Sequence, residues 1–95
     1  MAQMTKPIAH TIAAALTSEK VFGENPQRKR YLVQNRGPGI IYVSVQSTND
    51  ISGILVANGA TWIDEGAGPL SAVHCFEVWL TADTAATVCT LAEWT

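Results

Sequence analysis

Two histidines and two cysteines are the residues of this sequence most suited to catalysis or metal binding. They are His10, His74, Cys75 and Cys89. His10 and His74 are 64 positions apart, and neither C-x-x-C nor H-x-x-x-H spacing occurs. Cys75 follows His74, but successive side chains of a strand point to opposite faces. A strand over Val73–Leu80 would therefore exclude a Cys–His nucleophile pair.

The acidic residues and glycines form no other catalytic pattern. Asp64 and Glu65 lie at the end of a predicted strand, where we expect both carboxylates to be solvated. No glycine-rich phosphate loop precedes a helix. We therefore predict no catalytic residue, no cofactor and no metal site, and a protein that is not an enzyme.

Three tryptophans suggest a different kind of chemistry, because an exposed indole can stack on a sugar ring. Trp62, Trp79 and Trp94 all lie in the second half of the chain. No cluster of Asn, Asp or Gln adjoins any of them. We favour tryptophans that anchor the core or a protein interface, the role in which Trp is enriched. A glycan-binding module is the alternative.

The composition predicts one small domain with more apolar surface than it can bury alone. The chain has 95 residues, of which 47% are hydrophobic and 15% are charged, against about 25% charged in a typical soluble domain. An oligomer or a docked partner would cover the excess. The net charge of −2 argues against nucleic acid, and no apolar run reaches the about 18 residues of a membrane span.

Charge is distributed unevenly along the chain. All six Lys and Arg residues lie at or before Arg36, and the residues after it include six acids. One interpretation is a particle with a basic and an acidic face, suited to docking. The other is pairing between strands inside one fold. The sequence leaves both open.

The strongest strand signal lies between Asn25 and Val45. Two β-branched and aromatic runs flank Asn35-Arg36-Gly37-Pro38-Gly39, and we predict a hairpin there, with the Asn35 amide capping the turn. We also expect Arg28 to pair with an acid across the sheet.

Further strands are predicted on both sides of this stretch. Asn58-Gly59 predicts a two-residue hairpin between Gly53–Ala57 and Thr61–Asp64. A turn centred on Ala82 would pair the last two strands, Val73–Leu80 and Ala86–Trp94, and place Cys75 opposite Cys89. Their core face would then hold Phe76, Val78, Leu80, Ala86 and Val88.

These elements predict an all-β fold. We expect a small antiparallel β-sandwich or jelly-roll-like barrel of about seven to eight short strands. Residues 1–16 would form an extended N-terminal arm or an edge strand, and residues 17–95 a single β-sandwich domain. A jelly roll and an immunoglobulin-like sandwich are not distinguished at this point.

Several of these segments together resemble small β-sandwich virion proteins of tailed bacteriophages. They are Asn25-Pro26-x-Arg28-x-x-x-Leu32-Val33-Gln34-Asn35-x-Gly37, Ile41-Tyr42-Val43, Gly53-Ile54-Leu55 and Val88–Glu93. The resemblance covers roughly residues 8 to 94. It marks a fold module used in head decoration proteins, head-fibre bases and tail-associated modules. The two cysteines and the Trp-rich second half depart from it.

The resemblance implies a virion structural protein, and we favour a capsid decoration (cement) protein that binds the assembled head and stabilises capsomer joints. A tail, neck or fibre module is the alternative. The expected partners are the major capsid protein or another virion protein, and further copies of the chain, with a trimer favoured. Assembly in reducing host cytoplasm would favour free thiols over a disulfide. The candidate interface residues are Lys6, Ile8, Ile12, Arg28, Arg36, Tyr42, Trp62, Trp79 and Trp94.

Overall fold

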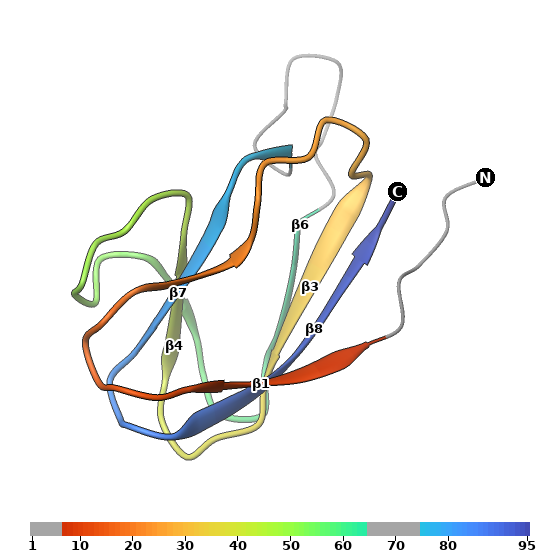
Figure 1. Ribbon diagram of the computed structural model, residues 1–95. Helices are drawn as coiled ribbons and strands as arrows, with labels where there is room; N and C mark the ends of the chain where they lie inside the picture. Colours follow the sequence, from red (N-terminus) through yellow and green to blue (C-terminus); the bar gives the residue numbers. More distant parts are fainter. Residues whose placement is uncertain (1–6, 65–74) are drawn as a thin grey trace.

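Eight strands, packed as two four-stranded antiparallel sheets, make up the part of the chain that the structure describes (Figure 1). The structure is a computed structural model and describes residues 7–64 and 75–95, which contain no α-helix. The strands are β1 (Ile8–Ile12), β2 (Glu19–Phe22), β3 (Arg30–Asn35), β4 (Ile41–Ser44), β5 (Ile54–Val56), β6 (Thr61–Asp64), β7 (Val78–Ala82) and β8 (Thr87–Trp94). The prediction of a small all-β sandwich is confirmed.

The order of the strands identifies the type of sandwich. Sheet A has the order β1-β8-β3-β6, and sheet B has the order β2-β7-β4-β5. The first strand pairs with the eighth, the second with the seventh, the third with the sixth and the fourth with the fifth. The chain therefore runs out and back as one long hairpin, with its tip at β4 and β5, rolled into two facing sheets. This is the arrangement of a jelly roll, the first of the two sandwiches that the sequence left open.

Period-two alternation places the core between the sheets. In β3 the side chains of Tyr31, Val33 and Asn35 are buried, and the intervening residues are partly exposed. Ile12, Ile41 and Leu80 from other strands are completely buried beside them. Side chains of alternate residues on one strand share a face, so both sheets contribute one face to a common apolar layer.

The three predicted hairpins are wrong, although the turns between their strands exist. β3 and β4 belong to different sheets, and so do β5 and β6, and β7 and β8. The Asn58-Gly59 segment does form a tight turn, closed by the Ala60 N–H donating to the Ala57 carbonyl at 2.9 Å, and Gly59 has a φ of 86°. Alternation and turn residues indicate where strands begin and end, but they do not specify a strand's partner.

The predicted core face of the last two strands is correct for β7 and wrong for β8. Val78 and Leu80 are buried as expected, whereas Phe76 is 45% exposed and precedes the strand. In β8 the buried residues include Cys89 and Leu91, while Val88 is only partly buried. The turn lies at 83–86 instead of at Ala82, and β8 crosses to the opposite sheet, so pairing with β7 does not determine which β8 residues face the core. Val73 lies outside the described residues.

The first two strands form one side of the sandwich. β1 pairs with β8 at the edge of sheet A, so residues 8–12 form an edge strand. The sequence analysis missed β2, whose four residues are flanked by no strong turn signal on their N-terminal side. β2 pairs with β7 through a register shift between Lys20 and Phe22.

Candidate interaction surface

Arg28 is not a surface residue but a buried connection between segments far apart in the sequence. Its side chain is 2% exposed, and its Nε donates to Glu93 Oε2 at 2.7 Å. The two terminal nitrogens donate to the carbonyl oxygens of Phe76 and Gly23, at 3.0 and 2.7 Å. The expected pairing of Arg28 with an acid is therefore confirmed. Arg28 is not available, however, to contact another protein.

Asn35 caps the turn after β3, as predicted. Its Oδ1 accepts from the Gly37 N–H at 2.8 Å, and its Nδ2 donates to the carbonyl oxygens of Gly39 and Val56, both at 2.8 Å. Val56 lies in β5, so the 1% exposed amide joins the end of sheet A to the edge of sheet B. A buried amide with these bonds made holds the sheets in one relative position.

Tyr42 is also removed from the candidate contact residues. It is 8% exposed, in a strand where Ile41 and Val43 on either side are buried as well. Across the sheet it is paired with Leu55 and Thr81. Alternation places Tyr42 on the face opposite Ile41 and Val43, and its side chain is buried on that face as well.

Two of the tryptophans are partly buried and bonded within the chain. Trp62 packs against the core from β6, and its Nε1 donates to the Tyr31 hydroxyl at 3.2 Å. Trp79, in β7, donates from Nε1 to Glu77 Oε1 at 3.3 Å. Both rings are half-buried, which leaves less of each face exposed for stacking on a sugar.

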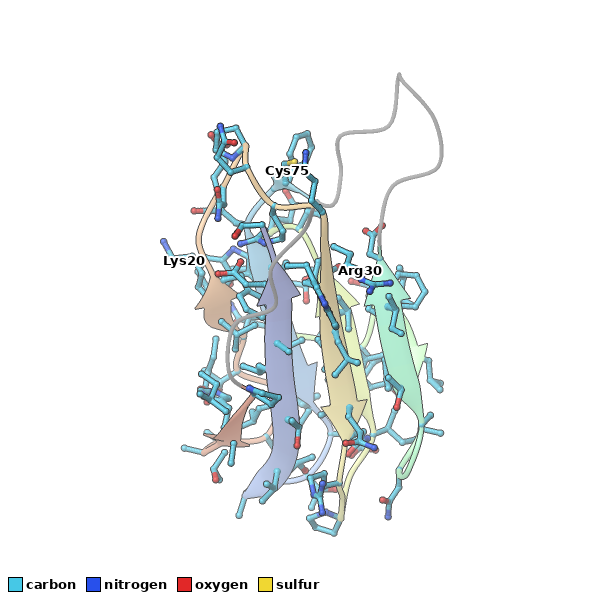
Figure 2. The ribbon with its side chains drawn as sticks, turned by 90° about the vertical axis from the view of Figure 1, so that its right-hand side faces the viewer. Lys20, Arg30 and Cys75 are labelled. Carbon is cyan, nitrogen blue, oxygen red and sulfur yellow. The ribbon has the colours of Figure 1, made fainter. Side chains whose placement is uncertain are left out.

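Trp94, at the end of β8, is also partly buried. The guanidinium carbon of Arg30 lies 4.3 Å from the centroid of a Trp94 ring, a cation–π contact between paired residues of β3 and β8. Figure 2 looks onto this sheet, with Arg30 labelled. The cation covers one face of the indole.

Internal ion pairs account for part of the uneven charge distribution. Lys20 Nζ lies 3.4 Å from Glu77 Oε2, and Arg28 is paired with Glu93. In both pairs a cation from the first part of the chain meets an acid from the last part. Pairing within the fold, one of the two interpretations left open by the sequence, is thus shown for these residues.

The two cysteines are free thiols in different surroundings. Cys89 is completely buried, and burial, reinforced by the nearby Glu19 carboxylate, raises the pKa of its thiol to about 11. Cys75 is partly exposed, and its Sγ lies 3.4 Å from the Arg28 carbonyl oxygen. The predicted pairing of Cys75 with Cys89 is wrong, because β8 pairs with β1 and β3.

One cluster that the sequence did not anticipate brings His10, Glu19 and Cys89 near one another. His10 Nε2 lies 2.9 Å from Glu19 Oε1, and Cys89 is the strand partner of His10. A nucleophilic cysteine needs a low thiol pKa and access to substrate, and Cys89 has neither.

Within residues 7–64 and 75–95, no three His, Cys, Asp or Glu side chains could share a metal ion. In the same ranges, no helix is long and apolar enough to cross a membrane.

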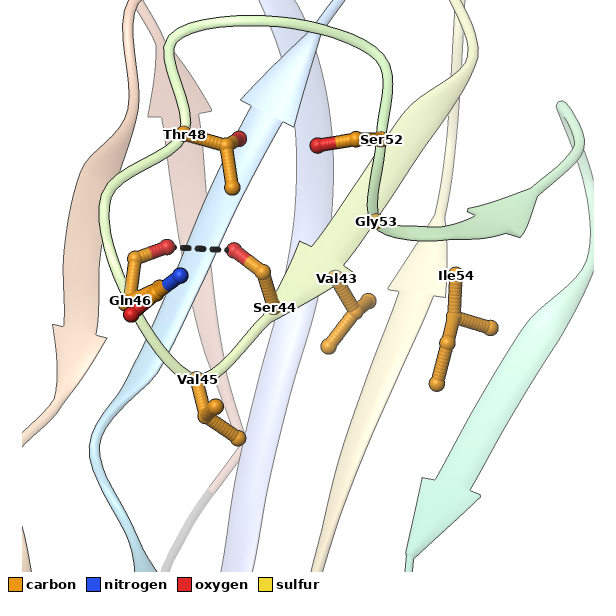
Figure 3. A pocket seen from close by; sticks show the side chains of 8 residues that line it. All are labelled: Val43, Ser44, Val45, Gln46, Thr48, Ser52, Gly53 and Ile54. Carbon is orange, nitrogen blue, oxygen red and sulfur yellow. Dashed lines mark hydrogen bonds between the residues drawn. The ribbon is translucent and has the colours of Figure 1, made fainter.

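A hollow lies in the loop between β4 and β5 (Figure 3). It has a volume of about 410 Å³ and is lined by Val43, Ser44, Val45, Gln46, Thr48, Ser52, Gly53 and Ile54. Its hydroxyls are used within the loop: Ser44 donates to the Gln46 carbonyl at 2.7 Å, and Ser52 donates to Asp50 Oδ1 at 2.5 Å. With no charged or aromatic side chain in its lining, the hollow is a poor fit to a ligand pocket.

The same loop is tied to the connection between β1 and β2. Ser18 Oγ accepts from the backbone N–H groups of Thr48 and Asn49, at 3.1 and 2.8 Å, and lies 2.6 Å from Thr81 Oγ1. The Ser18 N–H donates in turn to Asn49 Oδ1. These bonds fix the loop to the body of the fold.

Large apolar side chains exposed on the surface are the main feature suited to binding another protein. Those more than 40% exposed are Ile8, Leu16, Val45, Ile51, Ile54, Leu55, Ile63 and Phe76. Three of them lie in β5 and β6, the edge strands on one side of the sandwich. The sequence analysis did not single out these three, although both strands were predicted.

Four more candidate interface residues remain, and the structure describes three of them. Ile8 is 58% exposed on β1, whereas Ile12 is completely buried in the core, and Arg36 is exposed directly after β3. Lys6 lies outside the described residues. The nine candidates therefore do not form one surface, and Ile12, Arg28 and Tyr42 belong to the interior.

Comparison with known proteins adds no relative. No family model, no curated protein and no solved structure matches the chain. We therefore base the function on the strand order, on the exposed apolar side chains and on the resemblance seen in the sequence.

Proposed function

We propose that this protein is a structural subunit of a tailed-bacteriophage virion, a capsid decoration (cement) protein that binds the assembled head and stabilises capsomer joints. The observation that carries the proposal is a small jelly roll in which eight large apolar side chains are exposed within residues 7–64 and 75–95, while the hollow between β4 and β5 is a poor fit to a ligand. Jelly rolls recur among viral capsid proteins, although a fold alone does not determine function. The sequence resemblance to phage virion proteins points in the same direction.

The mechanism is burial of apolar surface against the shell. Exposed Leu and Ile side chains gain about 25 cal/mol for each Å² removed from water. A protein that binds the assembled shell but not its free subunits stabilises the assembled form by mass action. The cement function needs only this selectivity, and no chemical step. The proposed partners are the major capsid protein or another virion protein, and other copies of this chain.

Co-sedimentation tests the proposal. Heads of the encoding phage, prepared without this protein, are mixed with the purified chain, and their resistance to heat or chelator is measured with and without it. We expect saturable binding at a fixed number of copies for each capsomer and heads that open at a higher temperature. Heads that bind none of the folded protein would refute the decoration role.

A tail, neck or fibre module has the same surface requirements. Imaging of labelled virions separates these locations, because label on the head surface supports the decoration role and label at the neck or tail supports the alternative. Quenching of tryptophan fluorescence by sugars would support a glycan-binding receptor module. The partial burial of Trp62 and Trp79 argues against that last function.

A further inference from the structure

The two sides of the sandwich differ in how their edge strands are protected. β1 and β2 form one side, joined by the His10–Glu19 contact, and β5 and β6, the other edge strands of the two sheets, form the opposite side. An edge strand exposes unpaired backbone N–H and C=O groups that another strand can use. Natural proteins block this with charges, prolines or bulges.

The side formed by β1 and β2 has these protections. Pro7 immediately precedes β1, and β2 carries two charged residues, Glu19 and Lys20, within four positions. A register irregularity follows Lys20. Each of these features hinders the addition of another strand.

The side formed by β5 and β6 has fewer of these protections. Neither strand contains a lysine, an arginine or a proline, and both pair with their neighbours without a register shift. The charged residue of the two strands is Asp64, at the very end of β6. Ile54, Leu55 and Ile63 are 47%, 57% and 46% exposed along this side. A regular edge with large apolar side chains exposed along it is a site for strand pairing.

Backbone alternation shows which groups of β6 face outward. The Ala60 carbonyl accepts from the Asn35 N–H, so this carbonyl points towards β3. Alternate residues of an antiparallel strand bond to opposite sides. The N–H and C=O groups of Thr61 and Ile63 therefore point away from β3, towards the open edge.

We propose that a second copy of this chain pairs with this edge, β6 against β6 and antiparallel, about a two-fold axis near the middle of the strand. Charge selects this partner and this direction. Asp64 ends β6, and the exposed Arg36 lies beside Asn58 and Gly59 just ahead of the strand's other end. Antiparallel pairing brings Asp64 of each copy to the end of β6 that carries the partner's Arg36, and keeps the two Asp64 residues apart.

The contact is isologous, so it closes at two copies. Ile54 and Leu55 of β5 flank the paired strands and add apolar surface next to them. The dimer replaces the trimer that the resemblance suggested, and it does not depend on the virion function because it forms in the free protein. Failure to bind heads and failure to dimerise are therefore separate results.

The mass of the free protein in solution provides the first test. Sedimentation equilibrium over a concentration series up to about 1 mM should show a monomer–dimer equilibrium, since a dissociation constant of 1 mM corresponds to about −4 kcal/mol. A protein that stays monomeric over this range, or that forms trimers without dimers, would overturn the proposal.

A matched pair of variants locates the contact. Ile63→Lys places like charges across the two-fold axis, and the dimer dissociation constant should rise about tenfold or more. Ile8→Lys makes the same change at a similarly exposed residue of the opposite edge strand and should leave the constant unchanged. Circular dichroism checks that both variants are folded. Equal effects of the two substitutions would place the contact elsewhere.

Charge reversal tests the direction of pairing. Arg36→Glu should weaken the dimer and reverse its salt dependence, because it sets like charges near each other at both ends of the paired strands and salt screens this repulsion. Lys29→Glu reverses an exposed charge before β3 and is the control. If the two variants dimerise equally well, the antiparallel arrangement is incorrect.

Discussion

Arg28 and Glu93 stand 65 positions apart in the sequence, yet the Arg28 Nε lies 2.7 Å from Glu93 Oε2 in a site where the arginine is 2% exposed. The pair joins the segment before β3 to the end of β8. The guanidinium is further bonded to two backbone carbonyls and lies 5.0 Å from the ring centroid of Phe22. The site offers three acceptors, one carboxylate oxygen and two backbone carbonyl oxygens. The planar guanidinium of Arg28 has enough N–H donors to bond to all three.

Replacing Arg28 should therefore be among the most damaging single changes to stability. Arg28→Met leaves the Glu93 carboxylate without this partner, and we expect the free energy of unfolding in urea to fall by about 3 to 5 kcal/mol. Arg28→Lys should recover little, because an ammonium group cannot reach the same acceptors in a plane. Lys20→Met, which breaks the exposed pair with Glu77, is the control and should cost no more than about 1 kcal/mol. Comparable losses in Lys20→Met and Arg28→Met would contradict the assigned role.

Asn35 offers a test of the connection between the sheets. In Asn35→Asp the carboxylate cannot donate to the Gly39 and Val56 carbonyls, and a charge is placed at a buried position. We expect a loss of about 3 kcal/mol or more by urea denaturation, and a larger loss than in Asn35→Ala. A variant Asn35→Asp as stable as the parent protein would show that these amide bonds do not hold the sheets.

The two thiols should differ in reactivity and in their effect on alkaline stability. At pH 8 a thiol reagent should label Cys75 in the folded protein and leave Cys89 unlabelled until the chain unfolds. Labelling of both thiols at equal rates in the native state would contradict the buried position of Cys89.

The direction of the pH effect follows from the raised pKa of Cys89. The thiol pKa is about 11 when folded, against an ordinary 9.0, so the folded state holds the proton more tightly. The associated stability is fully present below about pH 9 and is lost as the pH rises through 11, by at most about 3 kcal/mol. Burial also raises the pKa of Tyr31, which acts in the same direction. Urea titrations of Cys89→Ala should therefore show a smaller decline over this interval, and a decline as steep as that of the parent protein would exclude the thiol as its cause.

Truncation separates the core strand from the residues before it. Removing residues 1–6 leaves β1 intact, so we expect a change in the free energy of unfolding below about 1 kcal/mol. Removing residues 1–16 deletes the fully buried Ile12 and should cost well over the about 2 to 5 kcal/mol of a large-to-small core substitution. Thermal melts of the two truncated chains measure the difference. If the chain without residues 1–16 has the same melting temperature as the chain without residues 1–6, β1 contributes little to the core.

The sequence predicted the strands of this fold better than it predicted their partners. Tyr31 and Val33 alternate with polar residues, and this period of two correctly placed β3 and its buried face. Asn35 was identified because a short amide beside Gly37 has a specific way of closing a turn. The pairing of β3 with β6 and β8 depends on contacts across the whole chain, on which local alternation carries no information.

The candidate contact residues were harder to predict for a related reason. Tyr42 and Arg28 have side chains that are often exposed, and their burial results from covering by segments far away in the sequence. Ile63 was not selected because an apolar residue in a short strand is usually in the core. Its exposure follows from the position of β6 at the edge of sheet A, which only the strand order reveals.

The nested strand pairing has a consequence for how the protein is made. β8 is the last strand to be synthesised, yet it lies between β1 and β3 in sheet A (Figure 1). Until β8 emerges from the ribosome, β1 and β3 have no strand to join them, so sheet A cannot close before β8 is made. Folding must wait for that strand, and neighbouring nascent chains have the whole interval in which to capture each other's open strands.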